Sequence, residues 1–227
     1  MNSASTYYPA SNTSGKTFDE WVSVLDQRLG GKVFFVEIGA MDGINHDALH
    51  KHIVAHPDWS GLLVEPLPDM FAKLTAAYAE HSNLLFENVA ITEADGTAEI
   101  ARIPASKVNA EAPAWADGIS TLRPSEHIIS QYDGLREHMV SEQITTMTFA
   151  SLAQKHHITH IDLYQSDTEG YDKVIFDQVW QAGFRPSIIK LEINYMYYHV
   201  IRDLFHLLGT AGYTCFYEDD DMVAVKL

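Results

Sequence analysis

The segment EIGAMDG (37–43) places two glycines and two carboxylates directly after an apolar run. Glycine turns that follow strands often bind nucleotide cofactors, because the backbone there can approach the ligand closely. A dinucleotide site would need a third glycine, and the carboxylate of Asp42 would repel a pyrophosphate. The acidic turn therefore favours a cofactor that carries positive charge and no phosphate.

Glu65 indicates that this cofactor contains a ribose. It ends a second apolar run, about 20 residues beyond the turn, where nucleotide sites place an acid on the ribose hydroxyls. A ribose joined to an ammonium and a sulfonium, without phosphate, describes S-adenosylmethionine (SAM). Glu65 has an alternative role, which is to cap the helix expected after Pro66. Asn88 likewise either faces the cofactor or is an ordinary residue at a strand end.

Further carboxylates follow two later apolar runs, in SDTEGYD (166–172) and LEIN (191–194). Transfer of a methyl group to a hydroxyl benefits from a general base or a metal ion. Carboxylate and amide oxygens suit Mg²⁺. The alternative for Glu169 and Asp172 is to cap the following helix, which explains Asp172 better than catalysis does. The candidate catalytic residues are Asp167, Glu169, Glu192 and His199, and a Mg²⁺ ion would be held by Asp167, Glu192 and Asn194.

These residues need a parallel sheet to bring them together. Strands are predicted where apolar runs of strand length occur, and helices where the apolar period is 3.6 residues. Thr17 and Glu20 predict a capping box at the first helix. The predicted strands span 32–38, 61–65, 83–92, 96–104, 161–167 and 187–194, the predicted helices span 17–31, 46–56, 68–81, 147–157, 171–183 and 199–209, and 212–227 is a closing hairpin.

The alternation of strands and helices predicts an α/β fold of the Rossmann-like kind, with a mostly parallel sheet covered by helices on both faces. The closing hairpin would add an antiparallel edge to this sheet. We expect a flexible polar tail over 1–15 and one domain over 16–227. Residues 104–140 read as a long lid or substrate loop. In that loop, GISTLRPSEH (118–127) either folds over the mouth of the site, with Arg123 facing an anionic substrate group, or is a surface loop.

Composition excludes several classes of partner. The net charge is −16 and no cluster of Lys or Arg relieves it, which argues against nucleic acid and anionic membranes. No apolar run is long enough to span a bilayer. Cys215 is the only cysteine, which fits a reducing compartment, and we expect a cytoplasmic protein. The oligomeric state stays open between a monomer and a homodimer.

The chain resembles the FkbM family of SAM-dependent methyltransferases. The likeness runs from about Phe34 to Glu192, and DTEGYD (167–172), followed by the strand PSIIKLE (186–192), is its most specific part. The other matching segments are FVEIGAMDG (35–43), LLVEPLPDMF (62–71), NVAIT (88–92), TMTFASL (146–152) and IDLYQSDTEGYDKVIF (161–176). The family more often has Asp at position 37, Asn at 41, an apolar residue at 166 and Glu at 172.

The resemblance implies a class I methyltransferase sheet of seven strands with a reversed final strand, and O-methylation of a hydroxyl on a sugar, natural product or other small molecule. It implies that Glu65 and Pro66 lie at the ribose, and that Asp167 lies beneath the methionine amine and the transferring methyl. Ser120 and Thr121 resemble a serine-rich patch of the family. By resemblance, the methionyl part is lined by Glu37, Gly39, Ala40, Asp42 and Gly43, and the adenine by Asn88, Val89 and Ala90.

Three alternatives stay open at the sequence level. A nicotinamide-dependent oxidoreductase is disfavoured by the missing glycine and by Asp42. A methyltransferase-like module that binds SAM or another ligand without catalysis is disfavoured by the acids at the strand ends. The acceptor atom could also be nitrogen or a carboxylate oxygen instead of a hydroxyl oxygen.

Overall fold

The computed structural model describes residues 15–108, 112, 116–117, 119–124 and 133–227. The predicted tail (1–15) lies outside the described residues except for Gly15, as does part of the predicted loop 104–140. No helix among the described residues is both long and apolar enough to cross a bilayer.

The main sheet has seven strands in the order β10-β11-β9-β8-β1-β2-β3. Neighbouring strands from β9 to β3 are parallel, and only β11 runs antiparallel to both of its neighbours. This order confirms the predicted Rossmann-like fold class. The strands are β1 (Phe34–Ile38), β2 (Ser60–Val64), β3 (Leu84–Glu87), β8 (Leu163–Ser166), β9 (Ile188–Glu192), β10 (Thr214–Glu218) and β11 (Asp221–Val225).

The closing hairpin forms the antiparallel edge of the sheet that the sequence predicted, and the structure adds the order of its two strands. Its second strand, β11, is inserted between β9 and β10, so that β10 forms the edge. The reason is burial on both faces, because Met222 and Ala224 pack in one core cluster and Val223 and Val225 in the other. A strand with two apolar faces is stable only inside a covered sheet.

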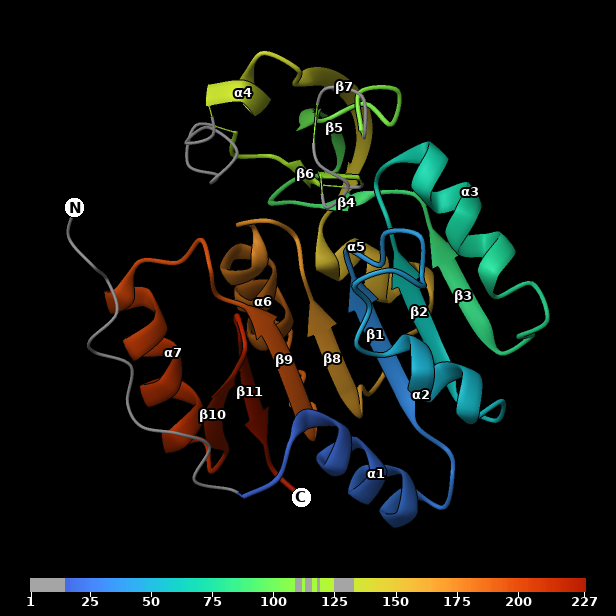
Figure 1. The fold of residues 1–227 in the computed structure, drawn as a ribbon. Coiled ribbons are helices and arrows are strands. Elements are labelled where there is room, and N and C mark those ends of the chain that lie inside the picture. Colours follow the sequence, from blue (N-terminus) through green and yellow to red (C-terminus); the bar gives the residue numbers. More distant parts are fainter. Residues whose placement is uncertain (1–14, 109–111, 113–115, 118, 125–132) are drawn as a thin grey trace.

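Helices cover both faces of the main sheet, as Figure 1 shows. On one face lie α1 (Phe18–Leu29), α2 (His50–Ala55) and α3 (Pro68–Ala77), and on the other α5 (Phe149–Lys155), α6 (Asp172–Gln181) and α7 (Tyr198–Thr210). Successive strand residues alternate between the two cores, as side chains of a strand must. Phe35 packs with the helices of the first face, for example, and Val36 with those of the second.

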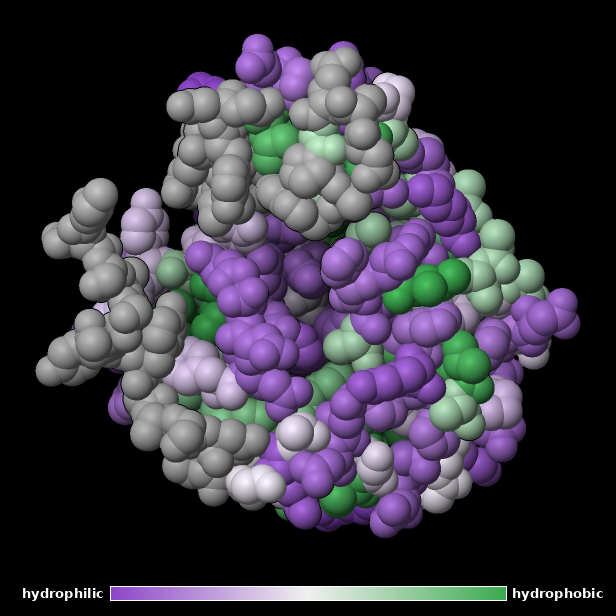
Figure 2. Space-filling model, in the orientation of Figure 1, coloured by the Kyte–Doolittle hydropathy of each residue, from purple (hydrophilic) through white to green (hydrophobic). Residues whose placement is uncertain are grey.

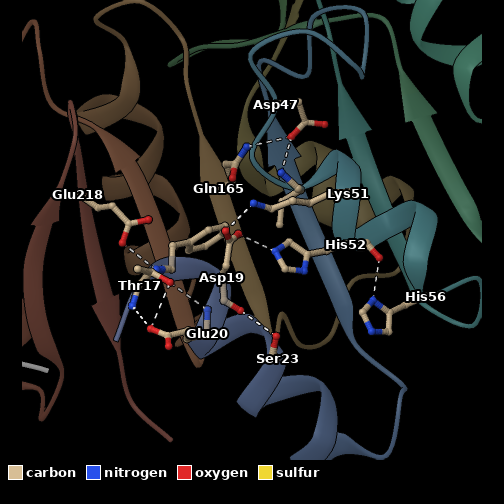
Figure 3. Close-up of polar contacts among 12 residues, drawn as sticks. Thr17, Asp19, Glu20, Ser23, Asp47, Lys51, His52, His56, Gln165 and Glu218 are labelled. Carbon is tan, nitrogen blue, oxygen red and sulfur yellow. Dashed lines mark hydrogen bonds and ion pairs between the residues drawn. The ribbon is translucent and has the colours of Figure 1, made fainter. Parts of the chain in front are cut away.

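Helix α1 is fixed at its amino end by the predicted capping box. The Thr17 hydroxyl accepts from the backbone N–H of Glu20, and the Glu20 carboxylate accepts from the N–H of Thr17 (Figure 3). The N–H of Phe18 also donates to the Glu218 carboxylate at 2.8 Å. These bonds tie the start of the helix to the edge strand β10.

A second sheet of four strands lies above the carboxyl ends of the central strands (Figure 1). Its order is β4-β7-β5-β6. The elements are β4 (Ala90–Ile91), β5 (Gly96–Arg102), β6 (Ser120–Thr121) and β7 (Val140–Met147), with α4 (Asp133–Arg136) between β6 and β7.

This sheet corrects two strand predictions. The run 83–92, predicted as one strand, divides between β3 of the main sheet and β4 of the second sheet. Strand β5, predicted over 96–104, pairs antiparallel with a further strand, β7. β7 itself was not predicted, because its residues are mostly polar and half of them face solvent.

Buried Arg102 joins the second sheet to α3. Its guanidinium donates two hydrogen bonds to Asp69 at 2.5 and 2.9 Å, and a third to Glu142 of β7 at 3.3 Å. The two carboxylates raise the pKa of Arg102, so the guanidinium stays charged. A planar guanidinium held by two carboxylates in this way fixes orientation as well as distance. The second sheet is thereby held over the end of the main sheet.

Candidate functional site

A cavity of about 340 Å³ lies where β1, β2 and β8 end, and residues of the second sheet close it from above. Figure 2 shows a hollow near the centre of this face, bordered by hydrophilic side chains. Open parallel sheets bind ligands at this place, beyond the carboxyl ends of their strands. The carboxyl side chains that line the cavity are those of Glu37, Asp47, Glu65, Asp117, Asp167 and Glu169.

Gly39 allows the loops after β1 and β8 to approach each other. Its φ is +87°, and a Cβ at this position would lie 1.9 Å from the carbonyl oxygen of Asp167. The N–H groups of Gly39 and Ala40 both donate to the carbonyl of Val64 at the end of β2. The ends of three strands thus converge on Gly39, and both Gly39 and Ala40 line the cavity as predicted.

Asp42 organises its own loop and does not line the cavity. Its carboxylate accepts from the N–H groups of Ile44 and Asn45, at 3.0 and 2.8 Å, and from the Asn45 side-chain amide at 2.6 Å. Although burial opposes them, these hydrogen bonds lower the pKa of Asp42. The predicted cofactor contact of Asp42 is therefore replaced by a structural role.

Gly43 also supports the fold and does not line the cavity. A Cβ there would lie 2.6 Å from Leu74 and 2.7 Å from the Tyr78 ring, so only glycine fits against α3. The Gly43 carbonyl accepts a hydrogen bond from the Tyr78 hydroxyl at 2.7 Å. These contacts fix the turn after β1 on the first helical face.

The acids that line the cavity beside β1 are Glu37 and Asp47. Glu37 is only 2% exposed, and its Oε1 accepts from the Gln165 amide at 2.9 Å. Burial and the neighbouring Asp47 carboxyl raise the pKa of Glu37 well above its usual value. Burial also raises the pKa of Asp47. The cavity is acidic beside β1, as the sequence predicted. The second carboxyl there, beside that of Glu37, belongs to Asp47 and not to Asp42.

Glu65 orders the backbone before α3, and its contact with the cofactor ribose stays a prediction. Its carboxylate accepts from the N–H of Leu67 at 2.8 Å, just before α3, and from the N–H of Met41 at 3.0 Å. It also lines the cavity together with Pro66. Burial raises the pKa of Glu65 to about 8. A buried carboxyl that binds backbone N–H groups on one side can still present an oxygen to a ligand on the other.

Asn88 positions the end of β2 and does not line the cavity. Its amide donates to the carbonyls of Glu65 and Pro66 at 2.8 and 3.0 Å. The two residues after it, Val89 and Ala90, do line the cavity, as predicted. Asn88 therefore acts on the site through the backbone that carries Glu65.

The carboxyls after β8 and β9 form a second acidic group. Burial, with Glu169 and Asp172 nearby, raises the pKa of Asp167 to about 7. Burial and the Asp167 carboxyl raise the pKa of Glu192 well above its usual value. The N–H of Glu169 donates to Glu192 at 3.0 Å and holds it beside Asp167. Asp167 and Glu169 line the cavity, with Glu192 directly behind them.

Asp172 is structural, but the helix cap that the sequence favoured for it is not formed, because the N-cap residue of α6 is Tyr171 and has no side-chain cap bond. It is 1% exposed, and it accepts from the Ser166 hydroxyl at 2.6 Å and from the Thr168 N–H at 3.3 Å. These bonds close the turn between β8 and α6. The polar Ser166, where related sequences more often have an apolar residue, is thus explained by its bond to Asp172.

Two predicted residues lie away from the cavity. His199 is exposed in the first turn of α7 and stacks on Tyr197, with ring centroids 5.9 Å apart. Asn194 is also exposed and does not line the cavity. Both follow β9, but the chain turns outward after Ile193. Within the described part of the chain, no group of three or more His, Cys, Asp or Glu is placed to hold a metal ion. The predicted Mg²⁺ set of Asp167, Glu192 and Asn194 is not supported, because Asn194 is exposed and lies outside the cavity.

The described part of GISTLRPSEH covers the cavity. Ser120 lines it, and the buried Thr121 hydroxyl donates to the Glu169 carbonyl at 2.8 Å. The guanidinium of Arg123 lies over the Tyr171 ring, 4.8 Å from its centroid. This part of the loop therefore folds over the mouth of the site, as one of the two interpretations predicted. Gly118 and residues 125–127 lie outside the described residues.

The loops of the site contain an unusual amount of left-handed backbone. Met41, His46 and Glu169 have positive φ angles of 49°, 59° and 55°, and all three line the cavity. Such conformations cost free energy and cluster at functional sites. Sequence analysis missed His46, Asp47 and Gln165, because none of them belongs to a glycine turn or directly ends a strand. The available signal for Gln165 was a polar residue within an apolar strand, whereas the segment around His46 and Asp47 is largely polar and gave no such signal.

The cavity fits a cationic nucleoside cofactor. Glu37 Oε2 and Gln165 Oε1 are buried hydrogen-bond acceptors without a partner among the described residues. A buried acceptor left unpaired is costly, so both are suited to donors from a ligand. Glu65 supplies a carboxylate for ribose hydroxyls, and Val89 and Ala90 supply apolar surface for a base.

Comparison with known proteins agrees with this chemistry. The family described as "Methyltransferase FkbM domain" matches residues 37–214. No curated protein sequence matches the chain.

Solved structures with a similar fold include three methyltransferases or related proteins. The METTL16 MTase domain is 11% identical with a TM-score of 0.47, and the match covers 91% of this chain and 65% of that one. Aeropyrum pernix fibrillarin, with natively bound S-adenosyl-L-methionine, is 10% identical with a TM-score of 0.43, covering 86% and 65%. Precorrin-6y C5,15-methyltransferase from Geobacter metallireducens is 13% identical with a TM-score of 0.41, covering 96% and 94%. The chain thus spans less than two thirds of the length of the first two.

The family match extends over most of the chain, including both acidic groups of the cavity. This match argues against the nicotinamide-dependent oxidoreductase that the sequence left open. The chain belongs to the FkbM methyltransferase family and is a SAM-dependent methyltransferase.

Proposed function

We propose that this methyltransferase methylates a hydroxyl group of a small molecule and that Asp167 is the general base. The observation that carries the proposal is the position of Asp167, which opens to the cavity at the end of β8 with a pKa of about 7. A general base is most effective when its pKa lies near the working pH. An alcohol is a weak nucleophile and needs such a base.

The neighbours of Asp167 support this role. When bound, SAM supplies an electrophilic methyl group to the site. Asp167 would take the proton that the acceptor hydroxyl loses. Burial, with the Glu169 and Asp172 carboxyls nearby, keeps the pKa of Asp167 high enough to accept it, and the Glu169 N–H holds Glu192 alongside. Apolar side chains of the second sheet and its loop, among them Ile100 and Leu122, cover the cavity and limit the access of water.

The charge of the cavity favours an uncharged or cationic acceptor. Its lining contains carboxyl groups but no Lys or Arg within the described part of the chain. The whole chain has a net charge of −16. An anionic acceptor such as nucleic acid would be repelled both at a distance and inside the cavity. We therefore propose a neutral hydroxylated metabolite, such as a sugar or natural product, as the acceptor.

A direct test is to incubate the purified protein with SAM and a panel of acceptors and to measure S-adenosylhomocysteine (SAH) by chromatography. The panel contains neutral sugars, phenols, primary amines and RNA. We expect product only with a hydroxylated small molecule. Transfer to an amine or to RNA would refute the proposal. Binding of SAH without turnover of any acceptor would instead support the non-catalytic module.

With an acceptor found, Asp167→Asn tests the base. We expect kcat/KM to fall by about 100-fold or more, the usual contribution of a general base, while SAH affinity changes by less than about threefold. In the unaltered protein kcat/KM should rise as pH increases through about 7, because the base acts only when deprotonated. The control is Asp177→Asn, which removes a carboxylate paired with Lys173 on the surface of α6. Equal activity of the Asp167 and Asp177 variants would contradict the assignment.

A further inference from the structure

Three side chains form what we call the carboxyl cradle: Glu37 of β1, Gln165 of β8 and Asp47 of the loop before α2. Glu37 and Gln165 are register partners in neighbouring parallel strands. The Gln165 amide donates to Glu37 at 2.9 Å and lies 3.5 Å from Asp47 Oδ1, a contact drawn in Figure 3. All three line the same wall of the cavity.

The cradle has more hydrogen-bond acceptors than the described residues satisfy. Glu37 Oε2 and Gln165 Oε1 receive no hydrogen bond from an N–H or hydroxyl donor of the described residues, and both residues are buried, at 2% and 6% exposure. The Glu37 carboxyl instead contacts the Asp47 carboxyl. Asp47 is better satisfied, because its Oδ1 accepts from the Leu49 N–H at 2.7 Å. An ammonium group carries three N–H donors and a positive charge, which is what two unpaired acceptors and two carboxyls require.

We propose that the carboxyl cradle binds the α-ammonium of the cofactor, that Asp47 is therefore a cofactor-binding residue, and that binding releases a proton which Glu37 and Asp47 share in the free protein. The proposal rests on the use of SAM, which family membership establishes, and is independent of the acceptor and of the role of Asp167.

The shared proton follows from the surroundings of the two carboxyls. Burial raises the pKa of both carboxyls, and the Asp47 carboxyl raises that of Glu37 further, so the two do not both ionise cheaply. The groups that face them are His50 of α2, Tyr78 just after α3, Asp167 just after β8 and Lys190 of β9. Lys190 forms an ion pair with Asp221, and His50 bonds the Tyr78 hydroxyl. An ammonium placed in the cradle would supply the missing positive charge, and the proton would leave to solvent.

Calorimetric titration with two probes separates the cradle from the rest of the site. SAH carries the α-ammonium, whereas 5′-methylthioadenosine has the same nucleoside and sulfur but no amino acid. We expect Asp47→Asn to weaken SAH binding by about 10- to 100-fold, as for a lost charged hydrogen bond, and to leave 5′-methylthioadenosine binding unchanged. The asparagine oxygen can still accept from Leu49, and thermal unfolding verifies that the variant folds. Asp58→Asn, at an exposed position near β2, is the control for loss of charge.

Titrations in two buffers of different ionisation enthalpy measure the proton. At pH 7 we expect the unaltered protein to release close to one proton more with SAH than with 5′-methylthioadenosine. The difference should vanish in Asp47→Asn and persist in Asp58→Asn. Equal proton release with the two probes in the unaltered protein, or equal weakening of both probes by Asp47→Asn, would overturn the proposal. Neither result would bear on the acceptor panel, so failure of one proposal is distinguishable from failure of the other.

Discussion

At the scale of single residues, the site depends on a few positions where only one side chain fits. Gly39 lies against the backbone of Asp167, and Gly43 lies against Tyr78. Asp42 is the most conspicuous acid in the sequence, but its carboxylate accepts hydrogen bonds from the backbone of its own turn. Its function is to shape the loop that delivers Asp47 to the cavity. Residue type and spacing therefore located the acidic turn but not the acid that faces the ligand.

Gly39→Ala should lower the free energy of unfolding by about 3 kcal/mol or more, because a left-handed conformation and a clash with the Asp167 carbonyl add together. Gly31→Ala is the matched control. Its φ of +78° is similar, but a Cβ there would have no atom within 4 Å, so we expect a loss of about 1 kcal/mol. Urea denaturation measures both values. Equal losses would show that the strands can move apart and that close approach is not required.

At the scale of elements, the second sheet makes the cavity an enclosed site. The main sheet and its helices supply Glu37, Glu65 and Asp167, and the second sheet closes the space above them. The links that hold it in place include the ion pair of Arg102 with Asp69 of α3 and the hydrogen bond from Thr121 of β6 to the loop after β8. The second link acts on the backbone of Glu169, whose N–H holds Glu192.

Thr121→Val tests this link with almost no change in volume. Loss of a buried hydrogen bond should lower the free energy of unfolding by about 1–2 kcal/mol, since the Glu169 carbonyl loses its donor. We also expect faster hydrogen exchange at the Glu169 amide, measured by mass spectrometry or NMR. Thr97→Val, at an exposed position of β5, should change stability by less than about 0.5 kcal/mol. Unchanged exchange at Glu169 would indicate that the loop is held by other contacts.

At the scale of the whole molecule, several carboxyl groups are buried in the interior of the protein. Burial raises the pKa of Glu37, Asp47, Asp172 and Glu192, and it raises that of Glu65 to about 8 and that of Asp167 to about 7. A carboxyl with a raised pKa binds its proton more tightly in the folded state than in the unfolded state. Folding without a ligand is therefore opposed when these groups ionise.

The free energy of unfolding of the ligand-free protein should fall by about 2 kcal/mol or more between pH 5.5 and 8. In this range the unfolded state has already lost protons that the folded state retains, so stability decreases as pH rises. Urea denaturation across this range measures the slope. Glu65→Gln should make the free energy of unfolding depend less steeply on pH near pH 8, because the amide does not titrate. Stability that rises with pH over this interval would contradict the ionisation states inferred for the cavity.

The sequence by itself determined the architecture and the class of cofactor. Apolar runs of strand length alternate with capped amphipathic helices, and this local pattern is sufficient to specify a covered parallel sheet. The acids at strand ends identified Glu65 and Asp167, because parallel strands bring their carboxyl ends to one edge. Gly39 was located by its glycine turn, and Val89 and Ala90 were located by the family resemblance; all three line the cavity.

Only the tertiary structure decided which polar side chains face the cavity. Asp47 and Gln165 enter it through strand register and loop path, whereas Asp42, Asn88 and His199 turn away from it. The division of residues 83–92 between two sheets and the insertion of β11 depend equally on contacts between distant segments. Periodicity describes one element at a time, so it specifies which face of a strand is apolar but not which neighbour covers it. Those neighbours, and the burial they create, set the acidity of the site.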